Sequence, residues 1–253
     1  MLLARAALSS GIIFPLYFYP FENCSGWTDA ISAAASHPNL PFYFIVNPNS
    51  GPGGLYTQPD ANYQACVPKL RGSPNVKLIG YVRTEYGKIA QSTVQAEVDT
   101  YAQWNSAYKL DGIFFDEVLA QSSARTLYSG YTSYAKSKIP NAFVSLNPGT
   151  KPDDTNFYNF ADQILSAEKY FSEFSSSTYT VGPSTPAAKQ AIILTDSPSD
   201  IQDITSTVNK IIKTDRIGAL YITDDVQANR QNPYDSFPTY WTDFVNAVQS
   251  AAS

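Results

Sequence analysis

The chain contains 253 residues, enough for one large domain with an extensive core. Hydrophobic residues make up 43% of the chain and charged residues 15%, which excludes an intrinsically disordered protein. The net charge is −5, and no cluster of Lys and Arg is present to neutralise phosphates, so we expect no nucleic-acid partner. No segment is long and apolar enough to predict insertion into a membrane.

Eight apolar runs rich in β-branched and aromatic residues recur along the chain and predict eight strands. The runs are nearly continuous rather than alternating, which is typical of parallel strands buried on both faces. The run at 163–168 is the least strand-like of the eight. The predicted strands are residues 11–20, 41–47, 76–82, 111–117, 142–147, 163–168, 190–195 and 219–223.

Helical patterns lie between these runs, and the eightfold alternation favours a (β/α)₈ TIM barrel over a doubly wound sheet. We expect one domain: residues 1–10 as an N-terminal extension or signal remnant, and residues 11–253 as the barrel catalytic domain. A polar loop is expected at 175–185. The predicted helices are residues 27–36, 61–70, 92–106, 123–137, a short turn at 157–161, 200–213 and 240–251.

Carboxylates stand at the ends of four of the predicted strands, at the end of the barrel where TIM-barrel active sites lie, and those of the fourth and sixth strands are the catalytic candidates. Asp116 and Glu117 come directly after Phe114 and Phe115, where two adjacent acids are costly to hold. Because side chains alternate along a regular strand, only one of these two acids should face the barrel axis. Glu168, two strands further around the barrel, can face the same pocket.

Two carboxylates across a cleft are the minimum machinery for cleaving a glycosidic bond, one donating a proton and the other staying ionised. From pattern alone, an acidic ion-pair network around Arg83 is an equally good reading of these residues. The 18 Tyr residues suit a sugar-binding cleft. The candidate substrate-binding residues are Tyr17, Tyr19, Asn47, Asn49, Tyr81, Arg83, Asn147, Tyr221 and Asp224.

Metal and cofactor chemistry has little support in the sequence, and we expect neither. The single histidine, His37, follows the first predicted helix and belongs to the opposite end of the barrel, so a Ser-His-Asp triad or a His-ligated metal is improbable. A calcium site at Asp116, Glu117, Asp224 and Asp225 has no spaced motif behind it.

The two cysteines, Cys24 and Cys66, fall near the top of neighbouring strand–helix units. A disulfide between them is favoured over two buried free thiols. Together with the few charged residues, this pattern predicts a secreted or cell-surface protein. Asn23-Cys24-Ser25 matches a glycosylation sequon, a tripeptide that often arises by chance.

Several stretches from the first strand to the last resemble the spherulin-4 family, and their combination is specific. They include NPNSGPG from Asn47, GIFFDE ending at Glu117, LNPGT from Leu146, and YITDD ending at Asp225. The resemblance implies a member of glycoside hydrolase family 135, which includes fungal secreted or surface enzymes that cut galactosaminogalactan, a cell-wall and biofilm polysaccharide. It further implies Asp116 as the nucleophile, Glu168 as the acid/base and Glu117 as a supporting acid.

The expected activity is therefore that of an endo-acting α-1,4-N-acetylgalactosaminidase working as a monomer on a GalNAc-containing polysaccharide. In an α-linked GalNAc the 2-acetamido group is cis to the leaving oxygen and cannot attack the anomeric carbon from behind, so a protein carboxylate or an activated water must do so. The resemblance favours a retaining mechanism. The alternatives are a non-catalytic carbohydrate-binding or spore-coat protein on the same barrel, and a hydrolase for another amino-sugar or galactose polymer.

Overall fold

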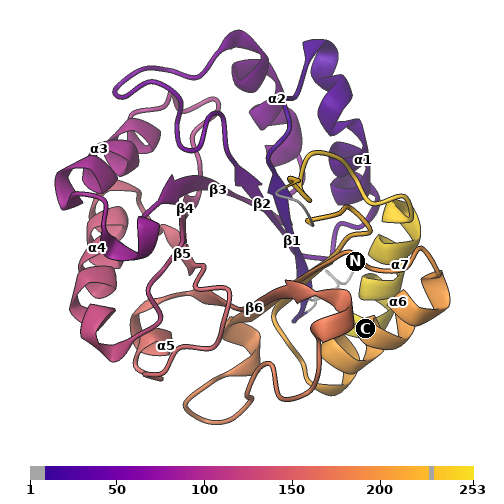
Figure 1. Cartoon of the computed structure of the whole chain (residues 1–253). Helices are drawn as coiled ribbons and strands as arrows, with labels where there is room; N and C mark the ends of the chain where they lie inside the picture. Colours follow the sequence, from indigo (N-terminus) through magenta and orange to yellow (C-terminus); the bar gives the residue numbers. More distant parts are fainter. Residues whose placement is uncertain (1–8, 228–230) are drawn as a thin grey trace, which may run out of the picture.

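Eight parallel strands close into a barrel in the order β1 to β8, surrounded by helices (Figure 1). The computed structural model describes residues 9–227 and 231–253, so most of the predicted N-terminal extension lies outside the described residues. Strand β1 closes the barrel by pairing with β8, Gly11 opposite Ala219. The strands are β1 Gly11–Leu16, β2 Phe42–Val46, β3 Val76–Arg83, β4 Gly112–Asp116, β5 Phe143–Leu146, β6 Gln163–Tyr170, β7 Gln190–Thr195 and β8 Ala219–Ile222. The predicted (β/α)₈ barrel is confirmed.

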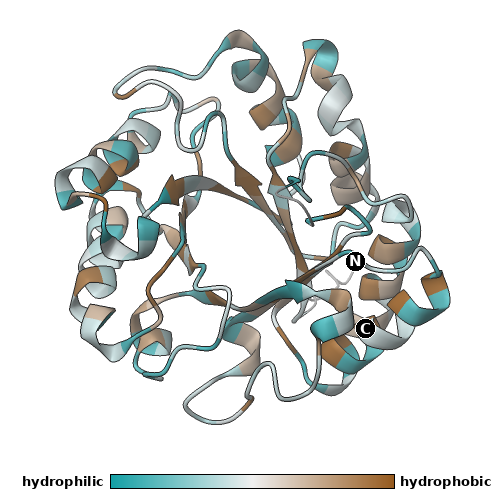
Figure 2. Cartoon of the chain, in the orientation of Figure 1, coloured by the Kyte–Doolittle hydropathy of each residue, from teal (hydrophilic) through white to brown (hydrophobic). Residues whose placement is uncertain are grey.

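The helices form the outer ring, and Figure 2 shows apolar residues concentrated on the strands they enclose. Helix α6 continues into a π-helical turn, Asn209–Thr214. The connection from β6 to β7 holds only two one-turn helices, Phe171–Glu173 and Ala187–Lys189, where other connections have a longer helix. The α-helices are α1 Thr28–Ser36, α2 Ala61–Arg71, α3 Gln91–Ala102, α4 Arg125–Lys138, α5 Phe157–Phe160, α6 Ile201–Val208 and α7 Trp241–Ala252.

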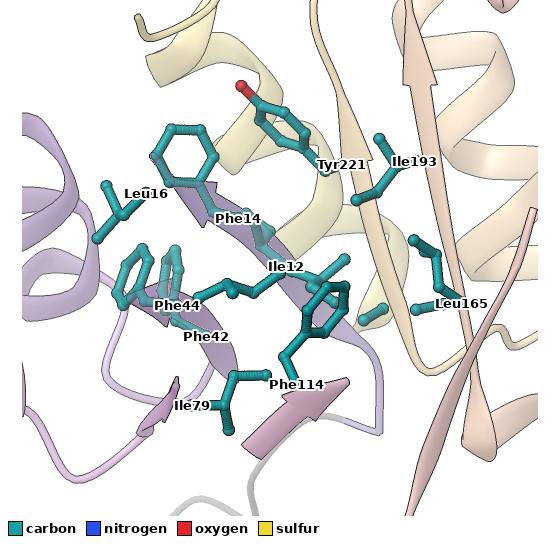
Figure 3. Packing of buried hydrophobic residues seen from close by; sticks show 14 of the residues in the cluster. Ile12, Phe14, Leu16, Phe42, Phe44, Ile79, Phe114, Leu165, Ile193 and Tyr221 are labelled. Carbon is teal, nitrogen blue, oxygen red and sulfur yellow. The ribbon is translucent and has the colours of Figure 1, made fainter. Parts of the chain in front are cut away.

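Large side chains fill the inside of the barrel (Figure 3). The rings of Phe14 and Tyr221 meet edge to face at 4.7 Å, and Phe42 and Phe44 stack at 5.5 Å. Phe114 projects into the same space and is 1% exposed. Because the barrel interior is packed, a ligand must bind above it, among the strand ends and the loops that follow them.

Strand β6, the weakest of the predicted strands, contains an irregularity that turns its end. Leu165 pairs with Ala191 and Ala167 pairs with Ile192, so Ser166 is an extra residue in the ladder. One extra residue reverses the alternation of side chains beyond it. Glu168 therefore faces the same side of the sheet as Leu165, toward the barrel axis, whereas a regular strand would turn it outward.

Candidate active site

A cavity of about 330 Å³ opens at the C-terminal end of the barrel, and we call it the acid cavity. It is built from the ends of β1, β4, β5 and β6 and from the loops after β3 and β8. The three acids predicted from the sequence all reach it. Its lining residues are Tyr17, Tyr86, Asp116, Glu117, Asn147, Pro148, Gly149, Glu168, Gln227 and Tyr234.

Asp116 and Glu117 both line the acid cavity although they are adjacent in the chain. Strand β4 ends at Asp116, and Glu117 has a φ of 52°, in the left-handed region that a non-glycine residue rarely adopts. We expected only one of the two acids to face the barrel axis because side chains alternate along a regular strand. The backbone departs from regular strand geometry at Glu117, so both acids reach the cavity. Backbone strain of this kind is concentrated at functional sites.

One amide nitrogen connects Asp116 with Glu168 across the cavity. Nδ2 of Asn147 donates to Oδ1 of Asp116 at 2.7 Å and to Oε2 of Glu168 at 2.9 Å. The two carboxylate oxygens that share this nitrogen therefore lie at most about 5.6 Å apart, the sum of the two contacts. Oδ1 of Asn147 accepts from the backbone N–H of Gly149 at 2.8 Å, which requires the amide to turn its nitrogen toward the acids.

Asp116 is held by donors on both of its oxygens. The hydroxyl of Tyr81, on β3, donates to Oδ2 at 2.7 Å, opposite the bond from Asn147. Burial, and next the negative charge of Glu168, raise the pKa of Asp116 from 3.8 to about 6, against the lowering effect of these hydrogen bonds. Asp116 therefore keeps its proton at a pH where ordinary aspartates have lost theirs.

Glu168 is fixed by its backbone and by its carboxylate. Its N–H donates to the carbonyl of Gly149 at 3.0 Å, joining β6 to the loop after β5. Gly149 has a φ of 64°, and a Cβ there would lie 3.7 Å from the Cβ of Glu168. The hydroxyl of Tyr234, in the loop after β8, donates to Oε1, the oxygen that Asn147 leaves free. Both oxygens of Glu168 thus have a donor from the protein.

Glu117 forms an ion pair with Arg83, whose Nε lies 2.9 Å from Oε2. The other end of the guanidinium is 3.8 Å from Glu85. Arg83 thus balances the negative charge of Glu117, the third carboxylate of the cavity. Asp116 is affected chiefly by burial and by the charge of Glu168. The ion-pair network considered from the sequence exists, but it involves Glu117 and not the Asp116–Glu168 pair.

Four of the nine predicted substrate-binding residues belong to this site. Tyr17 and Asn147 line the acid cavity. The ring of Tyr17 meets those of Tyr81 and Tyr234 edge to face, each at 5.4 Å. Tyr81 and Arg83 act through the acids they contact, Asp116 and Glu117.

The structure places the other five predicted substrate-binding residues outside the acid cavity. Tyr221 is fully buried in the barrel core against Phe14, so it cannot contact a substrate (Figure 3). Asp224 lies outside the acid cavity, bonded to the backbone N–H and hydroxyl of Thr239. The remaining three also lie outside the acid cavity: Oδ1 of Asn47 accepts from Gly51 N–H in its own loop, Asn49 is exposed in that loop, and Tyr19 is bonded to Asn62.

Three residues of the site escaped prediction because they lie in loops, not at strand ends. Tyr234 and Gln227 lie in the long connection from β8 to α7, where no apolar run shows which residue returns to the barrel axis. Tyr86 follows β3 by three residues and is 51% exposed. The only sequence signal that could have suggested Tyr86 was its position three residues after Arg83, in the loop that follows β3.

Outside the cavity, the cysteines form the favoured disulfide: Cys24 and Cys66 are bonded, with a Cα–Cα distance of 5.4 Å. His37 ends α1, where Nδ1 lies 2.8 Å from the carbonyl of Ala33, far from the acids. Within residues 9–227 and 231–253, no three His, Cys, Asp or Glu side chains are grouped to hold a metal ion. No helix among those residues is long and apolar enough to cross a membrane.

Solved structures with the same architecture include one of high similarity. Sph3 of Aspergillus clavatus, crystallised in complex with GalNAc, superposes with a TM-score of 0.86 at 27% identity, covering 97% of this chain and 98% of Sph3. The α-amylase of Geobacillus thermoleovorans, complexed with acarbose, superposes with a TM-score of 0.57 at 10% identity, over 98% of this chain and 79% of the amylase. At that identity the amylase shows only that the barrel is shared.

Sequence comparison gives the family. Spherulin-4 of Physarum polycephalum is 30% identical over 246 residues, which cover 94% of this chain and 70% of the relative. The family model described as Spherulation-specific family 4 matches residues 11–248, from the first residue of β1 into the last helix. The chain therefore belongs to the spherulin-4 family.

Proposed function

We propose that this protein is a secreted, endo-acting glycoside hydrolase that cleaves α-1,4-linked N-acetylgalactosamine in a galactosaminogalactan-type exopolysaccharide. The observation that carries the proposal is the Asp116–Glu168 pair, two carboxylates in one open cavity joined through Asn147. The GalNAc held by the similar protein Sph3 supports the substrate class. The Cys24–Cys66 disulfide supports secretion, since disulfides persist in oxidising compartments.

The separation of the two acids supports a retaining mechanism. Their shared oxygens lie at most about 5.6 Å apart, as the two contacts of Asn147 require. Retaining glycosidases place their carboxyl groups about 5–5.5 Å apart, and inverting ones about 6.5–9.5 Å apart to admit a water. The upper limit of about 5.6 Å between these two oxygens fits the spacing of retaining enzymes and supports direct attack by Asp116.

In the first step, Asp116 attacks the anomeric carbon while Glu168 protonates the departing glycosidic oxygen, giving a covalent glycosyl ester on Asp116. In the second step, a water gives its proton to Glu168 and displaces Asp116, which restores both groups and the original anomeric configuration. Hydrogen bonds from Tyr81 and Asn147 lower the pKa of Asp116 and favour the ionised form that attacks, against burial and the charge of Glu168, which raise it.

The test is release of reducing ends from purified galactosaminogalactan by the wild type, Asp116→Asn and Glu168→Gln, with Asp203→Asn on the outer face of α6 as a matched control. The proposal expects wild-type activity in the control and a loss of at least about 1,000-fold in each site variant with the fold intact. A wild type that binds the polymer without cleaving it would instead establish the non-catalytic, carbohydrate-binding reading.

A further inference from the structure

A second cavity, of about 340 Å³, adjoins the acid cavity, and we call it the side cavity. Tyr86 and Pro148 line both cavities, so the two lie next to each other along these residues. The side cavity lies over the loops that follow β3, β4 and β5, which are neighbours around the barrel (Figure 1). Its volume nearly equals that of the acid cavity, so if one sugar fits at the acids, there is room for another beside it.

Tyr86, at the boundary, is exposed but held in place. Its N–H donates to the carbonyl of Glu117 at 2.6 Å, and its φ is 55°, between Glu85 at 48° and Gly87 at 81°. The hydroxyl of Thr84 donates to the carbonyls of both Asp116 and Glu117. The backbone of the two acids thus positions an aromatic residue that is about half exposed. A ring fixed in advance loses little entropy when a ligand packs on it.

The floor of the side cavity presents apolar atoms because its backbone is already bonded. The N–H of Val118 donates to the carbonyl of Asn147, that of Leu119 to the hydroxyl of Tyr128, and the carbonyl of Ala120 accepts from Asp153. Polar side chains stand in the exposed part of the lining. They are Gln121, Thr150, Lys151 and Asp153.

An apolar floor with a polar rim is suited to one class of ligand, a pyranose lying flat. Its ring C–H groups and an acetamido methyl would pack on Val118, Leu119 and Ala120, while its hydroxyls reach the rim. A free small apolar molecule would leave the rim unpaired. Because the side cavity adjoins the acid cavity at Tyr86, the next unit of the same polysaccharide is the fitting occupant.

We propose that the side cavity is a second sugar subsite, which binds the N-acetylhexosamine unit adjoining the one held at Asp116 and Glu168. This inference rests on the proposed function, since it takes the acid cavity to hold a sugar. It predicts that affinity depends on the length of the oligosaccharide, as expected of an enzyme that binds several consecutive units within a polymer.

The test uses α-1,4-linked GalNAc oligomers of one to six units and the variant Ala120→Phe, whose ring would fill the side cavity. Ala107→Phe is the matched control, because Ala107 is exposed just before β4, at the opposite end of the barrel. Calorimetry measures binding to each chain in a Glu168→Gln background, so that nothing is cleaved. Initial rates on the same oligomers are measured with Glu168 intact.

We expect affinity to rise about tenfold or more between one unit and the longer oligomers, a gain of about 1.4 kcal/mol. Ala120→Phe should abolish this gain and leave binding of the single sugar unchanged, while Ala107→Phe should keep it. Equal affinity for all lengths, or a full gain in Ala120→Phe, overturns the subsite. Oligomers that bind with this length dependence but are not cleaved would refute the hydrolase proposal and leave the subsite standing.

Discussion

Replacing Asp116 by Asn should abolish catalysis and, above about pH 6, stabilise the fold. Burial and the charge of Glu168 raise the pKa of Asp116 from 3.8 to about 6, so the ionised form is disfavoured in the folded protein. That difference corresponds to a loss of stability of about 3 kcal/mol at high pH, at about 1.4 kcal/mol per pH unit. An amide carries no charge and avoids the loss. Its oxygen can still accept from Asn147, and its NH₂ can donate to Tyr81.

The sign of the effect follows from the two pKa values. Below about pH 3.8 the carboxyl is neutral in both the folded and unfolded chain, so the variant has no advantage. Between about pH 4 and 6 the unfolded carboxyl ionises before the folded one, and the advantage of the variant grows. Above about pH 6 both forms are ionised and the full advantage is reached.

The assay is urea unfolding of the wild type and Asp116→Asn at about pH 4 and about pH 8, read as free energies of unfolding. Asp154→Asn is the control of opposite sign, because hydrogen bonds from Asn156, with a smaller contribution from the charge of Arg125, lower the pKa of Asp154. It should be slightly less stable than the wild type at the higher pH. Equal stability of Asp116→Asn and the wild type at about pH 8 would refute the reasoning about the buried pair.

Three further predictions concern the site and its support. The value of kcat/KM should rise as the pH increases through about 6, because Asp116 must be ionised to attack and its pKa is raised to about 6; a rate that is level between about pH 4 and pH 8 would contradict this. Tyr234→Phe removes one donor from Glu168 and should lower kcat by up to about 100-fold with an unchanged circular dichroism spectrum, an effect that Tyr179→Phe, whose hydroxyl bonds to Asp215, should not produce. Replacing Cys24 and Cys66 together by Ser should lower the free energy of unfolding by about 4 kcal/mol, since the disulfide closes a loop spanning 42 residues; a change below about 1 kcal/mol would show that the reduced chain retains this loop.

The barrel could be predicted from the sequence because parallel strands buried on both faces leave continuous apolar runs, and all eight were recognised. The weakest run, 163–168, became an eight-residue strand with buried polar residues. Gln163 and Ser166 are tolerated inside because Ser145 and Gln190 bond to them. Such compensation depends on neighbouring strands, so the local pattern does not show it.

The site was predicted in its acids and less well in its surroundings. Asp116, Glu117 and Asn147 stand at strand ends, where position alone directs a side chain to the mouth of the barrel. For Glu168 the sequence indicated the end of the strand, but it did not indicate that Ser166 is an extra residue that turns Glu168 inward. Tyr234 comes from a long loop, whose return to Glu168 is a tertiary contact with no local sequence pattern.

Tyr221 is a strand residue that the sequence assigned to the site and that the structure places in the barrel core. It is fully buried against Phe14, where side chains fill the interior of the barrel. A residue at the end of a strand and one a single layer deeper look alike in a sequence, because the distinction depends on the tilt and stagger of the closed sheet.

The central claim is that Asp116 and Glu168 hydrolyse an α-linked GalNAc polymer with retention, and proton NMR of the first products tests it most directly. Oligomers of α-1,4-linked GalNAc are digested with the wild type, and the new reducing end is observed before mutarotation. The account predicts that the α anomer appears first and the β anomer grows in later. A first-formed β anomer would contradict the retaining pair, and the absence of any new reducing end would contradict the hydrolase itself.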